Sequence, residues 1–313
     1  MNQTLPTTDP TDTTAPPRPP RARRHAVIGY KGGSLKTTCI QCTAESAAAR
    51  GRNVLVIDTD PQANVTRRLR AHDTDRPTLA DVLHPRQPVP ITDAITVCGW
   101  PDVEWAPRIH VVQAPSMAHI STGCEQLEFR VQEAHLPGSE HRLRIAMKDI
   151  PDGHYDLVLI DTAPSMGHGL DLVLSALNNP GHGDGDGDRL WLGVNPTYDS
   201  IEGGLKFVRH VHTYRDNLSV PHLDIAGVIA TNVRLSNPLH ASVLDQMPDS
   251  FPGLVSPYVL PRHDRLEEVH HEALPVALYP ELHRKRWPGK GAAPIPSFKE
   301  SMDNMTGVII DAK

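Results

Sequence analysis

The sequence predicts an α/β fold in which helices cover both faces of a mostly parallel sheet. Short apolar runs without polar alternation recur along the chain, and segments of helical character separate them. Continuously apolar strands are typical of parallel sheets that are buried on both faces, and the strand–helix alternation supplies the crossovers that parallel pairing requires. With 313 residues, of which 39% are hydrophobic, the chain can bury a full core.

The predicted strands and helices follow one another in a regular order. Strands are expected at residues 26–29, 53–57, 109–112, 157–160, 190–194, 223–230 and 257–262. Helices are expected from the loop after the first strand to residue 50, and at 78–83, 126–150 with a break at 137–138, 200–217 and 298–312. Gly51 is suited to end the first helix, and the last helix places its apolar residues on one face.

The N-terminal segment differs in composition from the rest of the chain. Residues 1–24 are rich in Thr, Pro and Asp and then in Arg, with few apolar residues. Such a segment cannot bury enough surface to fold, so we predict a disordered tail and a single domain over residues 25–313. Arg18, Arg21, Arg23 and Arg24 could contact a phosphate backbone, although composition favours a solvated tail.

Charge and cysteine content exclude several classes of protein. The net charge is −6, so any contact with nucleic acid must come from a local basic patch. No apolar run approaches the length of a membrane span, and no signal-peptide core is present, so we expect a cytoplasmic protein that does not use a membrane. Cys39 and Cys42 form a C-x-x-C on a predicted helix, where buried packing is favoured over metal binding because no second pair exists.

A glycine-rich loop follows the first predicted strand and enters the first helix. It reads Tyr-Lys-Gly-Gly-Ser-Leu-Lys-Thr-Thr over residues 30–38. Backbone N–H groups and the helix dipole make such a loop a phosphate site, in which Lys36 neutralises charge and the Thr37 hydroxyl holds Mg²⁺. Tyr30 and Leu35 stand where the P-loop pattern G-x-x-x-x-G-K-S/T has glycine. The residues expected around the nucleotide phosphates are Gly32, Gly33, Ser34, Leu35, Lys36, Thr37 and Thr38.

Carboxylates follow two further strands. Asp58 and Asp60 come directly after the strand at 53–57, where a ligand lies in an open α/β sheet, although a helix cap and turn would also explain them. Asp161 ends the strand at 157–160. In P-loop ATPases such an Asp holds the Mg²⁺ shell, whereas in isolation it often caps a turn.

These motifs together resemble those of the ParA/MinD family of ATPases, which has a P-loop NTPase-like fold. Lys31, five residues before Lys36, gives the loop the family's deviant Walker A form, and Asp58–Asn64 matches its D-x-D-P-Q-x-N motif. The D-T-x-P-S sequence from Asp161 and the S-I-x-G sequence at 200–203 also match. The resemblance covers nearly the whole chain from residue 26 onward.

The resemblance implies roles for individual residues. Asp60 would orient the attacking water, Asp58 would support either the Mg²⁺ shell or the loop, and residues 162–169 would sense the γ-phosphate. Asn232 and the turn that begins at Pro261 would contact the adenine. Lys31 would reach across an ATP-dependent homodimer to the phosphates that the other subunit binds.

The implied function is a partition ATPase that uses ATP and Mg²⁺. The dimer would bind DNA without sequence preference, associate with the nucleoid, and be released when a ParB-like partner stimulates hydrolysis. The candidate DNA-binding residues are Arg234, Arg262, Arg265 and Arg284.

Three alternatives remain in view. A nucleotide-binding DNA scaffold that does not hydrolyse ATP is motivated by Leu35, whose Cβ could crowd the phosphates or force a strained φ. A MinD-like positioning ATPase should end in a basic amphipathic helix, yet residues 297–313 contain Glu300, Asp303 and Asp311. An iron–sulfur carrier of the same superfamily should show a late C-x-x-C, and no Cys follows Cys124.

Overall fold

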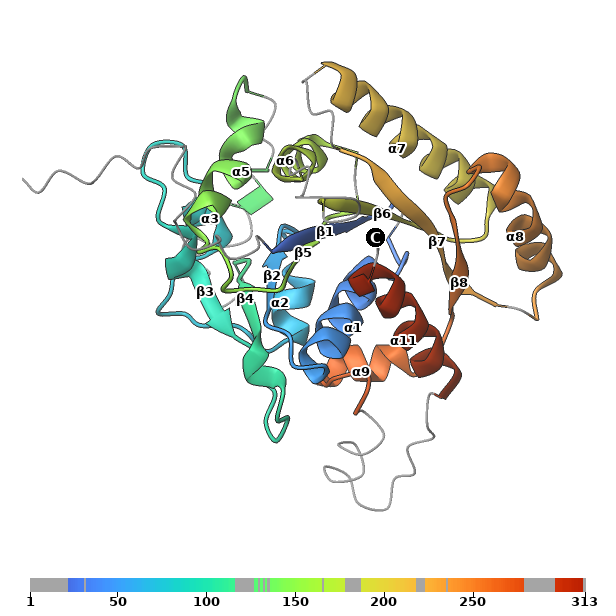
Figure 1. Cartoon of the computed structure of the whole chain (residues 1–313), viewed down its shortest axis with the longest axis horizontal. Helices are drawn as coiled ribbons and strands as arrows, with labels where there is room; N and C mark the ends of the chain where they lie inside the picture. The colour runs from blue at the N-terminus through green and yellow to red at the C-terminus, as the bar shows by residue number, and fades with distance from the viewer. Residues whose placement is uncertain are drawn as a thin grey trace, which may run out of the picture.

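The computed structural model describes residues 22–30, 32–115, 127–128, 130–131, 133, 136–164, 166–177, 187–217, 223–234, 236–278 and 296–311. Within these residues, eight strands form one sheet in the order β3-β4-β2-β5-β1-β6-β7-β8. Every neighbouring pair is parallel except β3 and β4. The predicted mostly parallel α/β fold is therefore confirmed (Figure 1).

The strands are β1 (Arg23–Ile28), β2 (Val54–Asp58), β3 (Ile95–Val97), β4 (Ile109–Val112), β5 (Leu157–Asp161), β6 (Arg189–Val194), β7 (Ile225–Val233) and β8 (Val255–Pro261). The seven predicted strands are confirmed, with shifts of a few residues at their ends. The sequence did not indicate β3, because this strand has only three residues and lies at the edge of the sheet with one face exposed.

The α-helices are α1 (Lys36–Ala49), α2 (Asn64–Arg68), α3 (Leu79–Val82), α5 (Arg142–Ala146), α6 (His168–Ala176), α7 (Tyr198–Asn217), α8 (Pro238–Ser250), α9 (Leu266–Glu272) and α11 (Pro296–Asp311). Short 3₁₀ segments are η1 (Ile91–Ala94), η2 (Ala106–Arg108), η5 (Ser139–His141) and η6 (Met147–Asp149). Helix α8 was not predicted: it buries only Val243 and Met247, and it contains Pro248.

The first strand begins at Arg23, earlier than predicted, and includes the last two residues of the segment for which we predicted a tail. Arg23 and Arg24 belong to β1. Arg24 is only 6% exposed, and its Nη1 donates a hydrogen bond to the carbonyl of Ala176 at 3.0 Å. A search for apolar runs misses this start because its polar residues are buried inside the fold. Residues 1–21 lie outside the described part of the chain.

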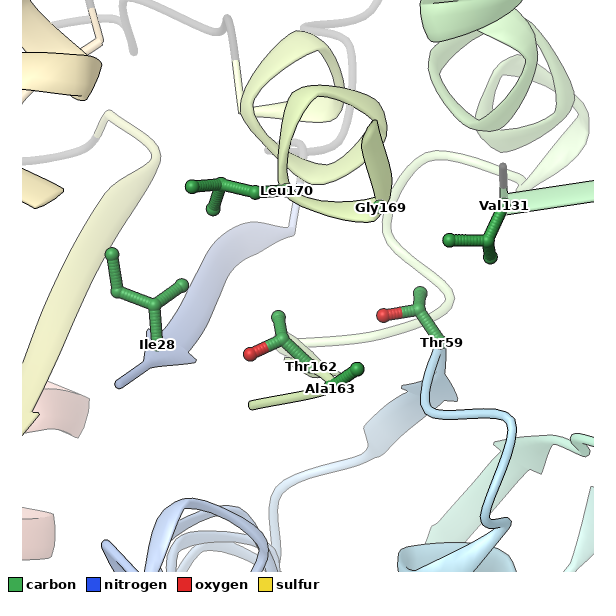
Figure 2. Close-up of a pocket in the computed structure, with 7 residues that line it drawn as sticks. All are labelled: Ile28, Thr59, Val131, Thr162, Ala163, Gly169 and Leu170. Atoms are coloured by element: carbon green, nitrogen blue, oxygen red, sulfur yellow. The ribbon is translucent and has the colours of Figure 1, made fainter. Parts of the chain in front are cut away.

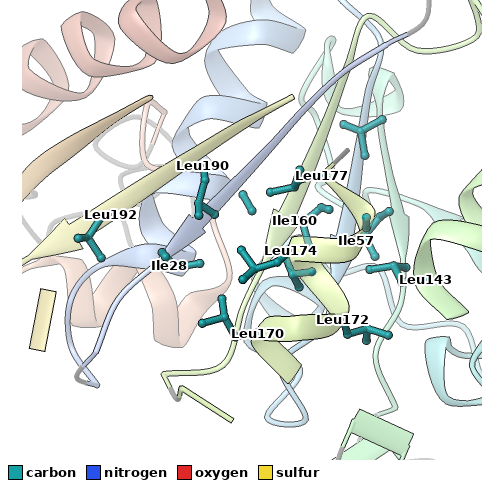
Figure 3. Close-up of a cluster of buried hydrophobic side chains, with 14 of the residues drawn as sticks. Ile28, Ile57, Leu143, Ile160, Leu170, Leu172, Leu174, Leu177, Leu190 and Leu192 are labelled. Carbon is teal, nitrogen blue, oxygen red and sulfur yellow. The ribbon is translucent and has the colours of Figure 1, made fainter. Parts of the chain in front are cut away.

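The core has two layers, one on each face of the sheet. Successive residues of one strand feed opposite layers, because side chains alternate across a strand. Ile160 packs in the layer under α6 and α7, whereas Leu159 packs in the layer under α1, α9 and α11. Figure 1 shows these helices on opposite faces, and Figure 3 shows Leu170, Leu174 and their neighbours from α6 against the sheet.

The C-terminal helix packs inward. Helix α11 contacts both α1 and β8, and its Met302 and Ile309 are buried. These two residues confirm part of the predicted apolar face; the side chains of Phe298, Met305 and Val308 lie outside the described set. None of the helices that the structure describes is both long enough and apolar enough to cross a membrane.

Candidate functional site

The carboxyl ends of three adjacent parallel strands bring the predicted motifs together. Strands β2, β5 and β1 are neighbours, and Asp58 at the end of β2 is in register with Asp161 at the end of β5. Thr59 donates from its backbone N and its Oγ1 to the Asp161 carbonyl at 3.1 and 2.6 Å. The Thr162 hydroxyl donates to the Val27 carbonyl at 2.9 Å. These bonds fasten the three strand ends to one another beside the glycine-rich loop.

The loop folds back tightly between β1 and α1. A Cβ on Gly29 would lie 2.7 Å from Ser34 Oγ and 2.9 Å from the Gly193 carbonyl, so only glycine fits there. Leu35 precedes α1 with φ 54° and ψ 20°, in the left-handed region. That conformation costs an L-residue with a side chain about 1–2 kcal/mol. The strained φ expected for Leu35 is thus observed.

Lys36 is the buried cation of the loop. Its side chain is 6% exposed, and Nζ donates to Ser34 Oγ at 3.4 Å. Burial lowers the pKa of Lys36, while the charges of Asp161 and Asp60 oppose that fall. Among the described residues no carboxylate forms an ion pair with it. A buried ammonium held by one hydroxyl is suited to an anion that enters the loop.

Asp161 is the carboxylate that best fits a metal. It is fully buried, and neither of its oxygens has a hydrogen-bond partner closer than 3.5 Å among the described residues. Burial raises its pKa to about 6, whereas the nearby Thr37 hydroxyl lowers it. Mg²⁺ prefers oxygen ligands and takes one or two carboxylates together with phosphates and water. Asp161 and Thr37 therefore fit this ion.

Asp58 is occupied by its own loop. Its Oδ1 accepts the backbone N–H of Asp60 at 3.1 Å, and its Oδ2 accepts the N–H and hydroxyl of Thr66 at 3.0 and 2.6 Å. Burial and the Asp161 charge raise its pKa well above the usual value. These bonds match the loop-supporting role of the two that were predicted; the metal role stays a prediction. Asp60, at the turn, is also buried.

A pocket of about 180 Å³ opens beside the loop. It is lined by Gly33 and Leu35 from the loop and by Asn232 from β7. Asn232, like Leu35, has a left-handed backbone, with φ 57°. Arg262 and His270 complete the wall, together with His263, Asp264, Leu266 and Glu267. The predicted base-contacting residue Asn232 thus lies at the loop, whereas Arg262 rather than Pro261 lines the pocket.

A much smaller cavity lies on the other side of the strand ends. It holds about 10 Å³ and is lined by Ile28, Thr59, Thr162, Ala163 and Leu170, together with Val131 and Gly169. Figure 2 shows Thr59 and Thr162 from neighbouring strand ends on one side and α6 on the other. Residues 162–169, the predicted sensing segment, therefore lead from Asp161 directly into α6.

The arginines predicted to contact DNA are partly neutralised. Arg262 Nε pairs with Asp264 at 3.3 Å, and Arg265 pairs with Glu268 at 3.5 Å. Arg234 is exposed. Lys31 and Arg284 lie outside the described residues.

Two features of the site were not predicted. The Tyr30 ring packs edge-on against Phe207 with the ring centroids 6.4 Å apart, and a Cβ on Gly203 of α7 would collide with it. The sequence contained a signal for this contact, because Tyr30 stands where the P-loop pattern has a glycine. The second feature is a contact of Thr38, whose hydroxyl accepts from Arg68 Nη1 at 3.1 Å and lies 3.2 Å from His270 Nε2.

Comparison with known proteins agrees with this arrangement. The family model described as an AAA domain matches residues 22–179. The chromosome partitioning protein ParA of Caulobacter vibrioides is 30% identical over 256 residues, which cover 81% of this chain and 86% of that protein. The sporulation initiation inhibitor protein Soj of Bacillus subtilis is 26% identical, covering 81% of this chain and 90% of its own.

Solved structures show the same fold. An ATP complex of a McdA variant from Cyanothece has a TM-score of 0.70 at 16% identity, covering 94% of this chain and 98% of that one. The cell division ATPase MinD of Pyrococcus furiosus has a TM-score of 0.60 at 21% identity, covering 91% of this chain and 99% of that one. The family match over half of the chain and the 30% identity to ParA show that this protein belongs to the ParA/MinD superfamily of P-loop ATPases, as a ParA-type partition ATPase.

Proposed function

We propose that this protein hydrolyses ATP with Mg²⁺ and uses the cycle to position DNA. One observation carries the proposal: a buried lysine and a buried carboxylate flank a glycine-rich loop at the ends of three parallel strands, and the carboxylate oxygens accept no hydrogen bond from any described residue. Relatives named ParA and Soj, and a solved MinD complex with Mg-ADP from Pyrococcus horikoshii, support the same chemistry.

Each residue of the site has its own role in the proposed hydrolysis. Lys36 neutralises charge on the phosphates as the bond to the leaving group breaks, and the loop N–H groups orient the nucleotide. Thr37 and Asp161 would hold Mg²⁺, which supplies further neutralisation when bound. The Asp58 carboxylate accepts the backbone N–H of Asp60 and so holds Asp60 in place. Asp60 orients the attacking water in line with the γ-phosphate.

The proposed cycle requires pairing of two copies. Lys31 of one subunit reaches the phosphates that the other binds, so that ATP favours the homodimer. The dimer binds DNA through phosphate contacts, for which Arg234, Arg262, Arg265 and Arg284 are candidates, and associates with the nucleoid in the cytoplasm. A ParB-like partner then stimulates hydrolysis. We propose that residues 25–313 act as one ATPase domain in this cycle.

The experiment is ATP turnover with and without DNA and a cognate ParB-like partner. Wild type, Lys36→Ala and Asp60→Ala should be compared, with Leu35→Gly as a fourth protein. We expect turnover in the wild type and a loss of at least about 100-fold in the Lys36 and Asp60 variants. A wild type that binds ATP without turnover, together with a Leu35→Gly variant that hydrolyses it, would establish the scaffold alternative instead.

Pairing is tested separately. Analytical ultracentrifugation with a non-hydrolysable ATP analogue should show dimers of the wild type and monomers of Lys31→Ala, while Arg52→Ala, a substitution of an exposed residue just beyond α1, pairs normally. Equal pairing of the Lys31 variant would contradict the assigned role of Lys31 and leave the hydrolysis proposal standing.

A further inference from the structure

A largely buried arginine of α2 lies beside the start of α1 and pairs with no carboxylate in the described part of the chain. Arg68 ends α2, and its Nη1 donates to Thr38 Oγ1 at 3.1 Å. Its Nε is buried and has no hydrogen-bond partner in the described part of the chain, where Arg68 also makes no ion pair. A guanidinium carries five N–H donors, and the bond to Thr38 uses one of them. Arginine is rarely buried in this way unless something pairs with it.

The charge of this group persists at neutral pH. Burial lowers the pKa of Arg68 to about 10, and the negative charge of Asp161 opposes that fall. Helix α2 packs against α1, and the hydrogen bond to Thr38 places the guanidinium beside the first turn of α1. Arg68 is therefore a cation held next to the helix that follows the glycine-rich loop.

His270, which also contacts Thr38, is neutral. His270 Nε2 lies 3.2 Å from the Thr38 hydroxyl. Burial lowers the pKa of His270 to about 3, and the charges of Arg68 and Arg67 contribute to that shift. A neutral imidazole nitrogen can accept the Thr38 proton while the hydroxyl accepts from Arg68. The positive charge of this cluster thus belongs to Arg68 alone.

The backbone around Arg68 is fixed in place. Trp100 Nε1 donates to the Arg68 carbonyl at 2.9 Å and to the Ala273 carbonyl at 3.0 Å. In the middle of α2, the backbone N–H and the hydroxyl of Thr66 donate to Asp58. Because these contacts hold the backbone of α2 and the Thr38 bond holds the guanidinium, less conformational entropy is lost when Arg68 binds an anion.

We propose that Arg68 binds the phosphate chain of the nucleotide, as a cation additional to the two loop lysines. The anion is identified by chemistry: Thr38 lies two residues after Lys36 in the first turn of α1, directly after the loop that receives phosphate, and a guanidinium is suited to bidentate contact with phosphate oxygens. This inference rests on the proposed nucleotide site and extends it to α2.

The test is calorimetric binding of tripolyphosphate and of a non-hydrolysable ATP analogue at two salt concentrations. Arg68→Gln should weaken both by about 10- to 100-fold, as expected for loss of a charge-assisted hydrogen bond, and should reduce the salt dependence. Arg67→Gln removes the same charge from an exposed neighbour that donates to the His270 carbonyl. Its affinity should stay within about threefold of the wild type.

The outcomes distinguish the proposed nucleotide site from the proposed role of Arg68. A wild type that binds neither probe overturns the nucleotide site itself. Tight binding by both wild type and Arg68→Gln, with a lower melting temperature in the variant, assigns Arg68 to packing between α1 and α2 and overturns the inference alone.

A measurement on the wild type covers the case in which Arg68→Gln does not fold. Phenylglyoxal modification of Arg68, mapped by mass spectrometry, should slow when tripolyphosphate is bound, while modification of the exposed Arg52 stays constant. An unchanged rate at Arg68 would overturn the inference.

Discussion

At the scale of single residues, the loop tolerates a side chain where its backbone favours glycine. Leu35 holds φ 54° and packs partly against the core layer under α1. Its apolar contacts offset the backbone strain, so a leucine can persist in a position that the general P-loop pattern gives to glycine. Strain and packing can be separated by substitution.

Leu35→Gly should be more stable than Leu35→Ala by about 1 kcal/mol, because both lose the leucine contacts and only alanine keeps the left-handed strain. Urea denaturation measures the two free energies of unfolding. At sites outside the left-handed region, an alanine variant is usually more stable than a glycine variant. A Leu35→Ala variant as stable as Leu35→Gly would therefore show that the loop has relaxed out of the left-handed region.

At the scale of elements, α1 is tied to the chain beyond α9 by a buried carboxylate. Glu45 Oε1 accepts the Val276 N–H at 2.9 Å and the Gln41 amide at 3.0 Å, and Oε2 accepts the Ala277 N–H at 3.0 Å. Burial raises the pKa of Glu45 to about 7, and these hydrogen bonds oppose the rise. The helix that carries Lys36 is thereby joined to the segment that follows His270.

Glu45 makes the stability of the protein depend on pH. The native state keeps the Glu45 proton up to about pH 7, whereas the unfolded chain releases it near the ordinary glutamate pKa of 4.5. The stability of the wild type relative to Glu45→Gln should therefore fall as pH rises from 4.5 to 7, by up to about 3 kcal/mol. Denaturant titrations of both proteins across this range measure the difference, and a constant difference would contradict the raised pKa.

The loop is also tied to α7, through Tyr30 and Gly203. Alanine in place of Gly203 would push its Cβ into the Tyr30 ring. Gly203→Ala should cost about 1–3 kcal/mol through overpacking, although alanine otherwise favours a helix. In a Tyr30→Asn background the same change should be neutral or stabilising. Thermal unfolding of the four proteins gives the coupling, and equal costs in both backgrounds would exclude the contact.

At the scale of the whole molecule, the sequence predicted the regular apolar strands of the sheet. It missed features that depend on individual tertiary contacts. The parallel strands were predictable because both faces of the sheet are buried, so their residues are uniformly apolar. The start of β1 was missed because Arg24 and His25 are polar yet buried, which depends on partners such as Ala176 and Trp191 that only the fold supplies.

The candidate site shows the same division. The strand ends that carry Asp58 and Asp161, and the loop that leads to Lys36 at the start of α1, were predictable from motifs, because parallel strands bring their carboxyl ends to one edge. The cluster of Thr38, Arg68 and His270 was not, because it joins residues up to 232 positions apart through α2 and α9. No periodicity or spacing encodes such a contact.

The most direct test of the central claim is calorimetric binding of a non-hydrolysable ATP analogue to the wild type and to Asp161→Ala, each with Mg²⁺ and with EDTA. The account predicts that Mg²⁺ tightens binding to the wild type by at least about tenfold, and that this gain disappears in the variant. Equal dependence on Mg²⁺ in the two proteins, or no binding by a folded wild type, would contradict it.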